Sequence, residues 1–258
     1  MSDAAAAVLI TGASSGIGAA LARAYAKRGA RLGLLGRREK ALAALCESLP
    51  GEHLVLVADV GDALQMAEAA RRFVSRFGIP DVVIANAGVS VGTLTEYASD
   101  LTAFEKVLRT NLLGMVSTFQ PFVEPMRQRR SGRLVGIASV AGIRGLPGVG
   151  AYSASKAAVI NYLESLRVEM HGSGVKVVTV APGYIRTPMT DVNDFPMPFL
   201  MAPDAAAAQI LRMVDAGRRY GVLPWQMALV ARLLRMVPRP LFDRVFARAG
   251  RKPRGLLR

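Results

Sequence analysis

The feature that most constrains the fold is an apolar run that ends in a glycine-rich turn. Residues Ala6–Ile10 are followed at once by TGASSGIG, Thr11 to Gly18, and then by a helical pattern. A strand, a tight glycine turn and a helix in this order let backbone N–H groups at the helix N-terminus approach an anion such as a pyrophosphate. Ser14 and Ser15 could add hydroxyl donors or cap that helix. The alternative is that the glycines only punctuate a turn.

Short apolar runs alternate with longer helical patterns along most of the chain. Apolar residues near a period of 3.6 separate successive runs, as in EKALAALCESL and ALQMAEAARRFVSRFG. Runs that are apolar throughout are typical of parallel strands buried on both faces. Right-handed crossovers then favour a doubly wound, Rossmann-type α/β sheet in three layers. The strands expected are Ala6–Ile10, Arg31–Leu35, His53–Val57, Val82–Ala85, Arg133–Ala138 and Val175–Ala181.

Length and composition suit one domain over residues 1–258, with 52% of the residues hydrophobic. Cys46 is the only cysteine, so no intramolecular disulfide can form, and His53 and His171 give no metal-ligand spacing. No uninterrupted apolar stretch reaches the roughly 18 residues of a membrane span, and Ala4–Ile10 is too short for a signal-peptide core. We therefore expect a cytoplasmic protein without a disulfide or a metal site.

Polar or turn residues follow every expected strand. Because parallel strands end at the same edge of a sheet, and ligands bind beyond that edge, these residues mark a candidate site. Loops are polar in general, so chance could explain one or two of them. Beyond the glycine turn they are Gly36–Arg38, Asp59 and Val60, Asn86–Gly88, Ser139, and Pro182 and Gly183.

In order and spacing, several motifs resemble those of the short-chain dehydrogenase/reductases. They are TGASSGIG, the NAG of residues 86–88, Asn111 within a helix, Ser139, YSASK at residues 152–156 and PGYIRT at residues 182–187. The resemblance covers roughly residues 5–190, and Ala85 departs from it where many relatives have a second asparagine. It implies a Rossmann-type domain with about seven parallel strands, a dimer or tetramer, and NAD(P)-dependent interconversion of a carbonyl and an alcohol.

The resemblance assigns the chemistry to four residues, Asn111, Ser139, Tyr152 and Lys156. Tyr152 would exchange the proton, Ser139 would hydrogen-bond the substrate oxygen as charge develops, and Lys156 would hold the nicotinamide ribose. Asn111 would help to keep a water-linked proton path to Lys156. Tyr152 and Lys156 lie about one helical turn apart, so we expect the ammonium to lower the pKa of the phenol from about 10. The residues alone also allow an exposed Tyr–Lys pair and a buried asparagine satisfied by backbone.

The residues after the second expected strand bear on the choice of cofactor. Sites for NAD usually place an acid there to hold the ribose 2′-hydroxyl, but this chain has Gly36 followed by Arg37 and Arg38. A guanidinium can bind the 2′-phosphate of NADP through charge-assisted hydrogen bonds, whereas a cation is otherwise disfavoured at a helix start. We therefore expect NADP in preference to NAD. The alternative is two solvated arginines.

The resemblance also places Asp59 and Val60 beside the adenine and residues 86–88 beside the adenosine ribose. The expected cofactor-binding residues are Gly12, Ser14, Ser15, Gly16, Ile17, Gly18, Arg37, Arg38, Asp59, Val60, Asn86, Ala87, Gly88, Tyr152, Lys156, Pro182, Gly183, Ile185 and Thr187.

The segment after PGYIRT, residues 188–203, is rich in methionine and phenylalanine. In the resembled family this region closes over the substrate. Its adaptable apolar side chains indicate either an apolar substrate, such as a lipid-like ketone or aldehyde, or a lid that only seals the nicotinamide site.

The C-terminal region is strongly basic, because residues 218–258 hold eleven Lys or Arg and one acid in a chain of net charge +14. The extension of residues 222–258 contains two basic amphipathic patterns, Trp225–Val237 and Leu241–Arg251. The second pattern places three arginines on one stripe, Arg244, Arg248 and Arg251. Three alternatives are open. The extension packs on the core or a sister subunit, residues 225–258 contact an anionic membrane surface, or they bind nucleic acid, which the missing aromatic interleaving disfavours.

Together these patterns predict an NADP-dependent oxidoreductase that moves hydride between the cofactor and a small-molecule carbonyl or alcohol, in a homo-oligomer. The alternative from another class is a non-catalytic NADP(H)-binding or membrane-associated scaffold, against which the intact set of Ser139, Tyr152 and Lys156 argues. An enzyme that uses the same site for dehydration or epimerisation is a third alternative, but the length and the TGASSGIG spacing favour oxidoreduction.

Overall fold

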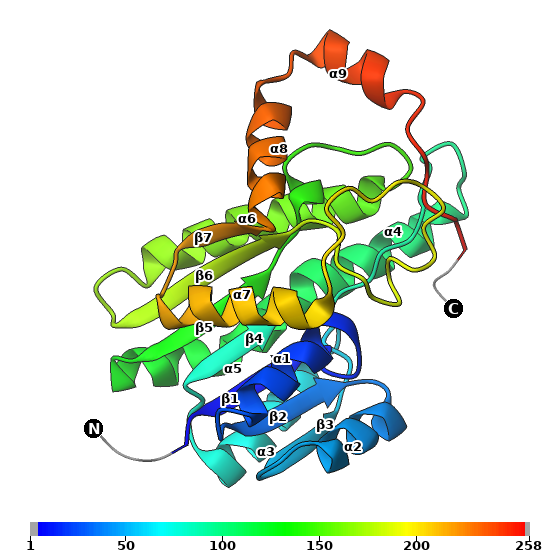
Figure 1. The fold of residues 1–258 in the computed structure, drawn as a ribbon. Helices are drawn as coiled ribbons and strands as arrows, with labels where there is room; N and C mark the ends of the chain where they lie inside the picture. Colours follow the sequence, from blue (N-terminus) through cyan, green and yellow to red (C-terminus); the bar gives the residue numbers. More distant parts are fainter. Residues whose placement is uncertain (1–4, 256–258) are drawn as a thin grey trace.

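A parallel sheet forms the centre of the computed structural model, which describes residues 5–255 (Figure 1). The strand order is β3-β2-β1-β4-β5-β6-β7 in a seven-stranded sheet. The strands are β1 (Ala7–Thr11), β2 (Arg31–Gly36), β3 (His53–Val57), β4 (Val82–Ala85), β5 (Gly132–Ile137), β6 (Val175–Pro182) and β7 (Tyr220–Leu223). The expected doubly wound α/β fold is confirmed. Each of the six strands expected from the sequence ends within one residue of its predicted bounds.

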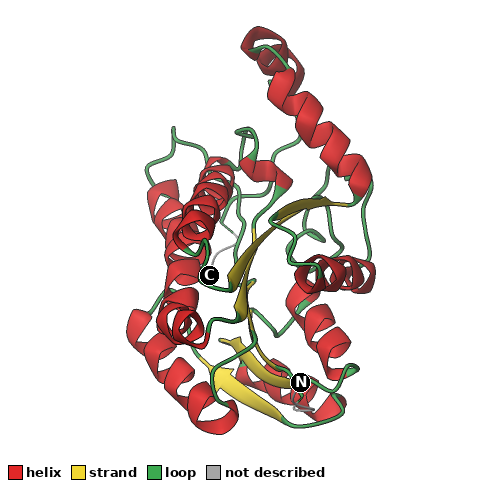
Figure 2. Ribbon diagram, turned by 90° about the vertical axis from the view of Figure 1, so that its left-hand side faces the viewer, coloured by secondary structure: helices red, strands yellow, loops and turns green. Residues whose placement is uncertain are grey.

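Helices cover both faces of the sheet, which Figure 2 shows with helices on either side of the strands. One face carries α1 (Gly16–Ala26), α2 (Glu39–Ser48) and α7 (Pro203–Asp215), and the other carries α3 (Ala63–Phe77), α5 (Gly114–Arg129) and α6 (Gly150–Glu169). Helix α4 (Asp100–Leu108) packs on α6 and leads through a π-helical turn, Arg109–Leu113, into α5. A short 3-10 turn, Val140–Gly142, follows β5.

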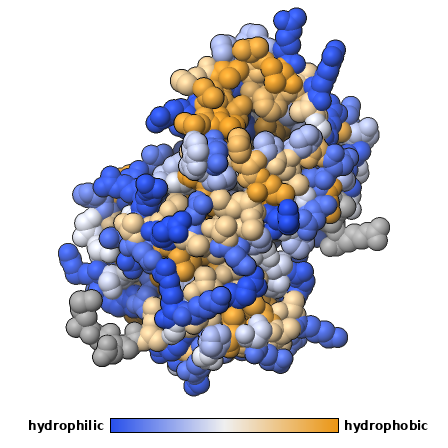
Figure 3. Space-filling view, in the orientation of Figure 1, coloured by the Kyte–Doolittle hydropathy of each residue, from blue (hydrophilic) through white to orange (hydrophobic). Residues whose placement is uncertain are grey.

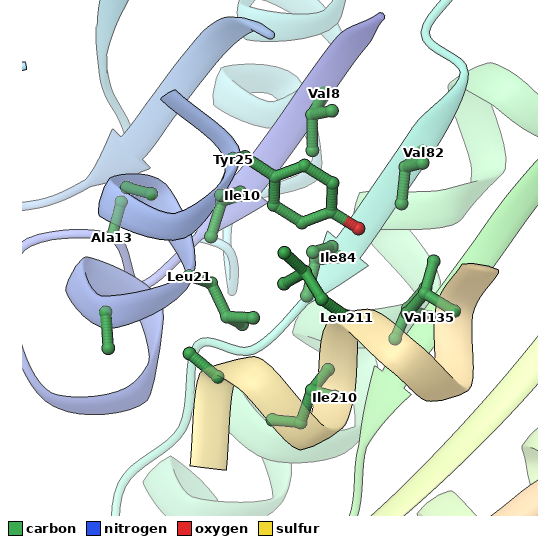
Figure 4. Close-up of a cluster of buried hydrophobic side chains, with 14 of the residues drawn as sticks. Val8, Ile10, Ala13, Leu21, Tyr25, Val82, Ile84, Val135, Ile210 and Leu211 are labelled. Atoms are coloured by element: carbon green, nitrogen blue, oxygen red, sulfur yellow. The ribbon is translucent and has the colours of Figure 1, made fainter. Parts of the chain in front are cut away.

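The core has one apolar layer on each side of the sheet. Because successive strand residues point to opposite faces, Val8 and Ile10 of β1 join the layer under α1 and α7, whereas Leu9 joins the layer under α3 and α5. Figure 4 shows the first layer, where Leu21 of α1 and Leu211 of α7 lie with the β1 side chains. Burial on both faces explains why the strand runs are apolar throughout rather than alternating.

The strand order reverses at β1. From β1 the chain steps outward through β2 to β3, returns to β4 on the other side of β1, and then steps outward to β7. The helix after β1 lies on one face of the sheet and α5, after β4, lies on the other. In open α/β sheets a ligand crevice forms at such a point, beyond the carboxyl ends of the strands.

The C-terminal region differs from the sequence expectation in where its elements begin. The extension expected from residue 222 begins after β7, because Val222 and Leu223 complete that edge strand. Four residues at a sheet edge, only partly buried, give too short a pattern to be recognised. Two helices then follow, α8 (Trp225–Met236) and α9 (Arg239–Phe246).

The expected stripe of three arginines in the last helix is wrong. Helix α9 ends at Phe246, so Arg248 and Arg251 do not share a helical face with Arg244. The physical reason is that the chain turns back to the body, where the Lys252 side chain becomes buried. The end of the expected extension, residues 256–258, lies outside the described residues. Within residues 5–255 no helix combines the length and the hydropathy needed to cross a bilayer.

Candidate active site

A pocket of about 400 Å³ opens at the carboxyl edge of the sheet. Residues that follow β1 to β6 all contribute to its wall, so the convergence expected from the strand ends is what the fold produces. Among the expected cofactor-binding residues, those that line it are Gly12, Ser14, Ser15, Gly16, Ile17, Arg37, Arg38, Asp59, Val60, Asn86, Ala87, Gly88, Tyr152, Lys156, Pro182, Gly183, Ile185 and Thr187.

The glycine turn after β1 needs its glycines for two different reasons. Gly12 and Gly16 adopt φ values of 66° and 55°, which residues with a side chain rarely adopt. A Cβ on Gly16 would also lie 2.9 Å from a Thr187 methyl group across the pocket. Gly18 is not among the lining residues; a Cβ there would lie 2.3 Å from the Gly12 carbonyl oxygen. The third glycine therefore lets α1 pack against the turn rather than touch a ligand.

The N-terminus of α1 points its backbone donors at this pocket. Its first turn contains no acidic residue, and the Ser15 side chain at the N-cap makes no capping hydrogen bond. The unpaired N–H groups and the helix dipole favour an anion. Together with the room that Gly12 and Gly16 leave, these donors fit the pyrophosphate of a dinucleotide.

Two arginines after β2 lie at the same end of the pocket. Arg38 donates through Nη2 to the hydroxyl oxygens of Ser14, at 2.9 Å, and Ser15, at 2.7 Å. Arg37 makes a longer contact of 3.5 Å with the carboxylate of Asp59, between exposed side chains. Arg38 and Ser14 thus present a guanidinium and a hydroxyl side by side at the pocket wall.

The turn after β4 is tied directly to the glycine turn. The Asn86 side chain donates to the carbonyl oxygens of Thr11, at 3.0 Å, and Gly12, at 3.3 Å. In return, the Thr11 hydroxyl oxygen accepts the N–H groups of Asn86 and Ala87 at 3.1 Å each. These bonds join the carboxyl ends of β1 and β4 across the crevice.

Ser139 follows β5 in extended backbone and begins the short 3-10 turn. Its hydroxyl oxygen accepts the Ala141 N–H at 3.1 Å. The side chain is largely buried and lines the pocket. A serine hydroxyl has one proton to donate as well as two lone pairs, so Ser139 can still donate one hydrogen bond to a group in the pocket while it accepts from Ala141.

Tyr152 and Lys156 stand on the first two turns of α6 and both line the pocket. Lys156 is 4% exposed, and its ammonium donates to the Ile137 carbonyl oxygen at the end of β5, at 2.7 Å. Burial lowers the pKa of Lys156 to about 8. The same ammonium lies 5.8 Å from the centre of the Tyr152 ring.

The expected lowering of the Tyr152 pKa by the ammonium is not what the structure gives. Burial raises the pKa of the phenol above its ordinary value, and a hydrogen bond with Ser139 offsets this only in part. The reason is that the ammonium is turned to the Ile137 carbonyl instead of the phenol, while the packed pocket wall removes water from both groups.

Asn111 is fully buried in the π-helical turn and is not among the lining residues. Its amide accepts the Val89 N–H at 2.8 Å and donates to the Val89 carbonyl at 3.0 Å. It also donates to the Ser155 hydroxyl at 2.9 Å, which in turn donates to the Tyr152 carbonyl at 2.7 Å. The side chain therefore joins the loop after β4 to the turn of α6 that carries Tyr152.

Several lining residues were missed by the sequence analysis. Four of them are apolar residues at or near strand ends, and nothing in their residue type distinguishes them from core residues: Ala58, Val89, Ile137 and Ala138. Thr110 has a weak signal, its position next to Asn111. The rest, Pro188, Met189 and Thr190, open the segment expected as a lid and directly follow Thr187.

Known proteins are similar over most of the chain. A family model described as short chain dehydrogenase matches residues 6–195. Over 238 residues the chain is 38% identical to a Myxococcus xanthus protein named as an uncharacterized oxidoreductase, covering 91% of this chain and 94% of that protein. It is 36% identical over 183 residues to a 3-oxoacyl-(acyl-carrier-protein) reductase of Rickettsia typhi, covering 71% of this chain and 74% of that protein.

Solved structures are similar as well. A crystal structure of a 3-oxoacyl-(acyl-carrier protein) reductase from Brucella melitensis, with bound NAD, superposes with a TM-score of 0.73 at 30% identity. The match covers 84% of this chain and 87% of that one.

Proposed function

The chain belongs to the short-chain dehydrogenase family and is an NAD(P)-dependent oxidoreductase, and we propose on that premise that it moves hydride between NADP(H) and a carbonyl or alcohol. The observation that carries this proposal is that Ser139, Tyr152 and Lys156 line one pocket together with the glycine turn. A scaffold that only binds nucleotide would have no need of a half-buried phenol and a buried ammonium at that place.

The nicotinamide supplies or accepts the hydride when it is bound, and the chain's own residues handle the oxygen and the proton. Ser139 donates its hydroxyl proton in a hydrogen bond to the substrate oxygen. Tyr152 transfers a proton to that oxygen during reduction or removes one during oxidation. Because burial raises the pKa of Tyr152, the phenol is protonated at neutral pH, which suits reduction of a carbonyl. Lys156 holds the nicotinamide ribose through its remaining donors.

Tyr152→Phe is the direct test of this proposal, because it removes the proton donor and leaves the ring. We expect kcat for reduction of a ketone, followed by NADPH absorbance, to fall by about 10²- to 10⁴-fold. The affinity for NADPH, measured by nucleotide fluorescence, should stay within about twofold. Full turnover by the variant would remove Tyr152 from the chemistry, and a wild-type protein that binds NADPH but reduces no ketone would favour the scaffold.

We propose NADP in preference to NAD because of Arg38. Its guanidinium lies beside the Ser14 hydroxyl at the pocket wall, where a 2′-phosphate would accept hydrogen bonds from both groups. Equal KM values for NADPH and NADH would contradict this choice.

The substrate we propose is an apolar carbonyl compound. Met189 lines the pocket, and the lid of residues 188–203 continues with Phe195 in edge-to-face contact with Tyr184. The similar 3-oxoacyl reductases are named for ketones that carry an acyl chain. Turnover of 2-decanone, acetone and an acetoacetyl thioester would separate the alternatives, since a lid that only seals the site should not favour the longer chain.

We propose that the α8–α9 arm contacts an anionic membrane surface. On α8, Met227 and Ala231 pack on the body, while the opposite stripe is apolar and more than half exposed. That stripe consists of Trp225, Leu229, Leu233 and Met236. Figure 3 shows apolar residues gathered at the end of the molecule that the arm forms, with hydrophilic side chains projecting beside them. An apolar stripe beside arginines is typical of helices that lie in a lipid interface.

Sedimentation with vesicles tests the arm. Wild-type protein should sediment with phosphatidylglycerol vesicles and not with phosphatidylcholine vesicles, and Leu229→Gln with Leu233→Gln should abolish sedimentation. If the wild type and the double variant sedimented equally with phosphatidylglycerol vesicles, the membrane proposal would be wrong. Light scattering tests the dimer or tetramer that we also propose, and a double variant that becomes monomeric would assign the stripe to a sister subunit.

A further inference from the structure

After α9 the chain returns to the body. In Figure 1 the segment of residues 247–255, here named the C-terminal strap, runs back beside the yellow lid and the loop before α4. The contacts of the strap fasten it to both of these segments. Neither the family motifs nor the proposed chemistry uses them.

The first contact joins the strap to the lid. The Lys252 ammonium donates to the Met189 carbonyl oxygen at 2.6 Å, and the lysine is 6% exposed. Burial lowers the pKa of this lysine to about 8. Removing an ammonium from water costs free energy that a single carbonyl acceptor offsets only in part. An apolar side chain would fill the same space at lower cost, so packing alone does not account for a lysine here.

The second contact anchors the strap at the start of α4. Arg254 donates to both carboxylate oxygens of Asp100, at 2.7 and 2.9 Å, and its guanidinium lies 3.6 Å from the centre of the Tyr97 ring. Asp100 also accepts the Leu94 N–H at 2.8 Å. A two-pronged ion pair stacked on an aromatic ring fixes the arginine more firmly than a single exposed salt bridge does.

The third contact is made by the backbone. The Gly92 N–H donates to the Pro253 carbonyl at 2.9 Å, and a Cβ on Gly92 would lie only 2.1 Å from the Lys252 carbonyl oxygen. The next residue, Thr93, accepts the Ala151 N–H with its hydroxyl at 3.3 Å. The strap therefore packs against the loop of Gly92 and Thr93, which also hydrogen-bonds the turn of α6 that carries Tyr152.

We propose that Lys252 and Arg254 are positioning residues for the reaction. Lys252 holds Met189 in the pocket wall, and Arg254 anchors the strap so that the lid stays over the substrate side. Breaking either contact should loosen the lid and weaken binding of the ketone, while the dinucleotide side of the pocket is unaffected. The substrate part of this statement rests on the proposed function, but the position of the lid does not.

Hydrogen exchange measured by mass spectrometry on the full-length protein tests the lid without turnover. The lid amides of Asp191 and Met201 donate to Thr187 and Tyr184, at 2.9 and 3.0 Å, and report its closed form. In Lys252→Met and in Arg254→Gln we expect these amides to exchange at least about fivefold faster, because local opening becomes easier. Amides of β1 should exchange as in the wild type.

Three comparisons make the outcome specific. Arg248→Gln changes an exposed arginine of the same strap and should leave lid exchange unchanged, while Arg254→Lys should restore most of the protection lost in Arg254→Gln. With 2-decanone and NADPH, the lid variants should raise KM for the ketone at least about fivefold with an unchanged NADPH affinity. Lys252→Met keeps the test decisive if Arg254→Gln fails to fold, since it replaces a buried charge by an apolar side chain of similar length. Wild-type lid exchange in folded Lys252→Met would overturn the proposal, whether or not the enzyme reduces the ketone.

Discussion

Tyr152 and Lys156 share one packed wall, and burial moves their pKa values in opposite directions. Both shifts favour the uncharged form, because a buried charge loses its hydration. A neutral phenol is ready to donate a proton, and a lysine with a pKa of about 8 changes its charge near neutral pH. The Ile137 carbonyl, which accepts from Lys156, orients the amine.

Arg38 gives the sharpest prediction about the cofactor. Arg38→Gln removes the guanidinium beside Ser14, and a lost charge-assisted hydrogen bond to a phosphate costs about 1.5 to 3 kcal/mol. We expect the NADPH dissociation constant to rise about 10- to 100-fold, with little change for NADH. Arg37→Gln is the matched control, since Arg37 contacts Asp59 instead of Ser14 or Ser15. If Arg38→Gln and Arg37→Gln weakened the binding of NADPH and of NADH to the same extent, the effect would be one of general charge, and Arg38 would not form a specific phosphate site.

Asn111 gives a second prediction, in which stability and rate change together. Asn111→Ala leaves the N–H and carbonyl of Val89 without their partner and breaks the link to Ser155. Because the site is fully buried, we expect a loss of about 3 kcal/mol in the free energy of unfolding, measured in urea. We also expect a lower kcat, since the turn that carries Tyr152 loses a support. A stable variant with full kcat would show that this link does not position Tyr152.

Helix α1 and the glycine turn act as one unit, because Gly18 brings the helix against the Gly12 carbonyl. Gly18→Ala would place a Cβ 2.3 Å from that oxygen and 2.7 Å from the side-chain nitrogen of Asn86, which leaves little room to adjust. We expect at least a tenfold weaker NADPH affinity and a stability loss of about 1 to 3 kcal/mol. Gly150→Ala is the control in another helix, where a Cβ meets no atom within 4 Å. Equal behaviour of the two variants in fluorescence titration and thermal unfolding would exclude this packing role.

The C-terminal region illustrates how one stretch of chain divides into parts with different surroundings. Helix α8 buries one face and exposes the other, α9 ends early, and the strap returns to the pocket. Residues that belong to one basic extension in the sequence therefore take part in two different proposals, contact with a lipid surface and positioning of the lid.

Two buried lysines make the stability of the protein depend on pH. Lys156 and Lys252 have pKa values of about 8 in the folded protein, against an ordinary value of 10.5. Above pH 8 the folded protein has lost these protons while the unfolded chain still holds them, so the free energy of unfolding rises with pH. Below pH 8 both states hold the protons and the cost of burying them is constant. Between pH of about 8 and about 9.5 each lysine should add about 1.5 kcal/mol.

Lys252→Met isolates this effect, because it removes one of the two titrations. The free energy of unfolding of both proteins is measured in urea at several pH values. As the pH rises from about 8 to about 9.5, the wild type should gain stability relative to Lys252→Met. Lys27→Met, at an exposed position, is the control for removing a lysine charge from the chain. A pH-independent difference for Lys252→Met would mean that the folded protein keeps this amine charged.

Sequence patterns predicted the layered α/β fold and six strands, and the family resemblance pointed to most of the residues that line the pocket at the carboxyl edge of the sheet. They could do so because two-sided burial marks a parallel strand within a few consecutive residues, and because the glycine turn and the YSASK turn are each local. The edge strand Tyr220–Leu223 carried no such mark, since it is short and half exposed.

What sequence patterns could not supply depends on contacts between distant parts of the chain. Lys252 contacts Met189, 63 residues away in the sequence, and Arg254 contacts Asp100, 154 residues away. No local sequence pattern could therefore predict the contacts of the strap. The sequence also could not predict that the pKa of Tyr152 is raised rather than lowered. Spacing places the phenol and the amine on one helix, but only the packed pocket wall removes the water that would have stabilised their charges.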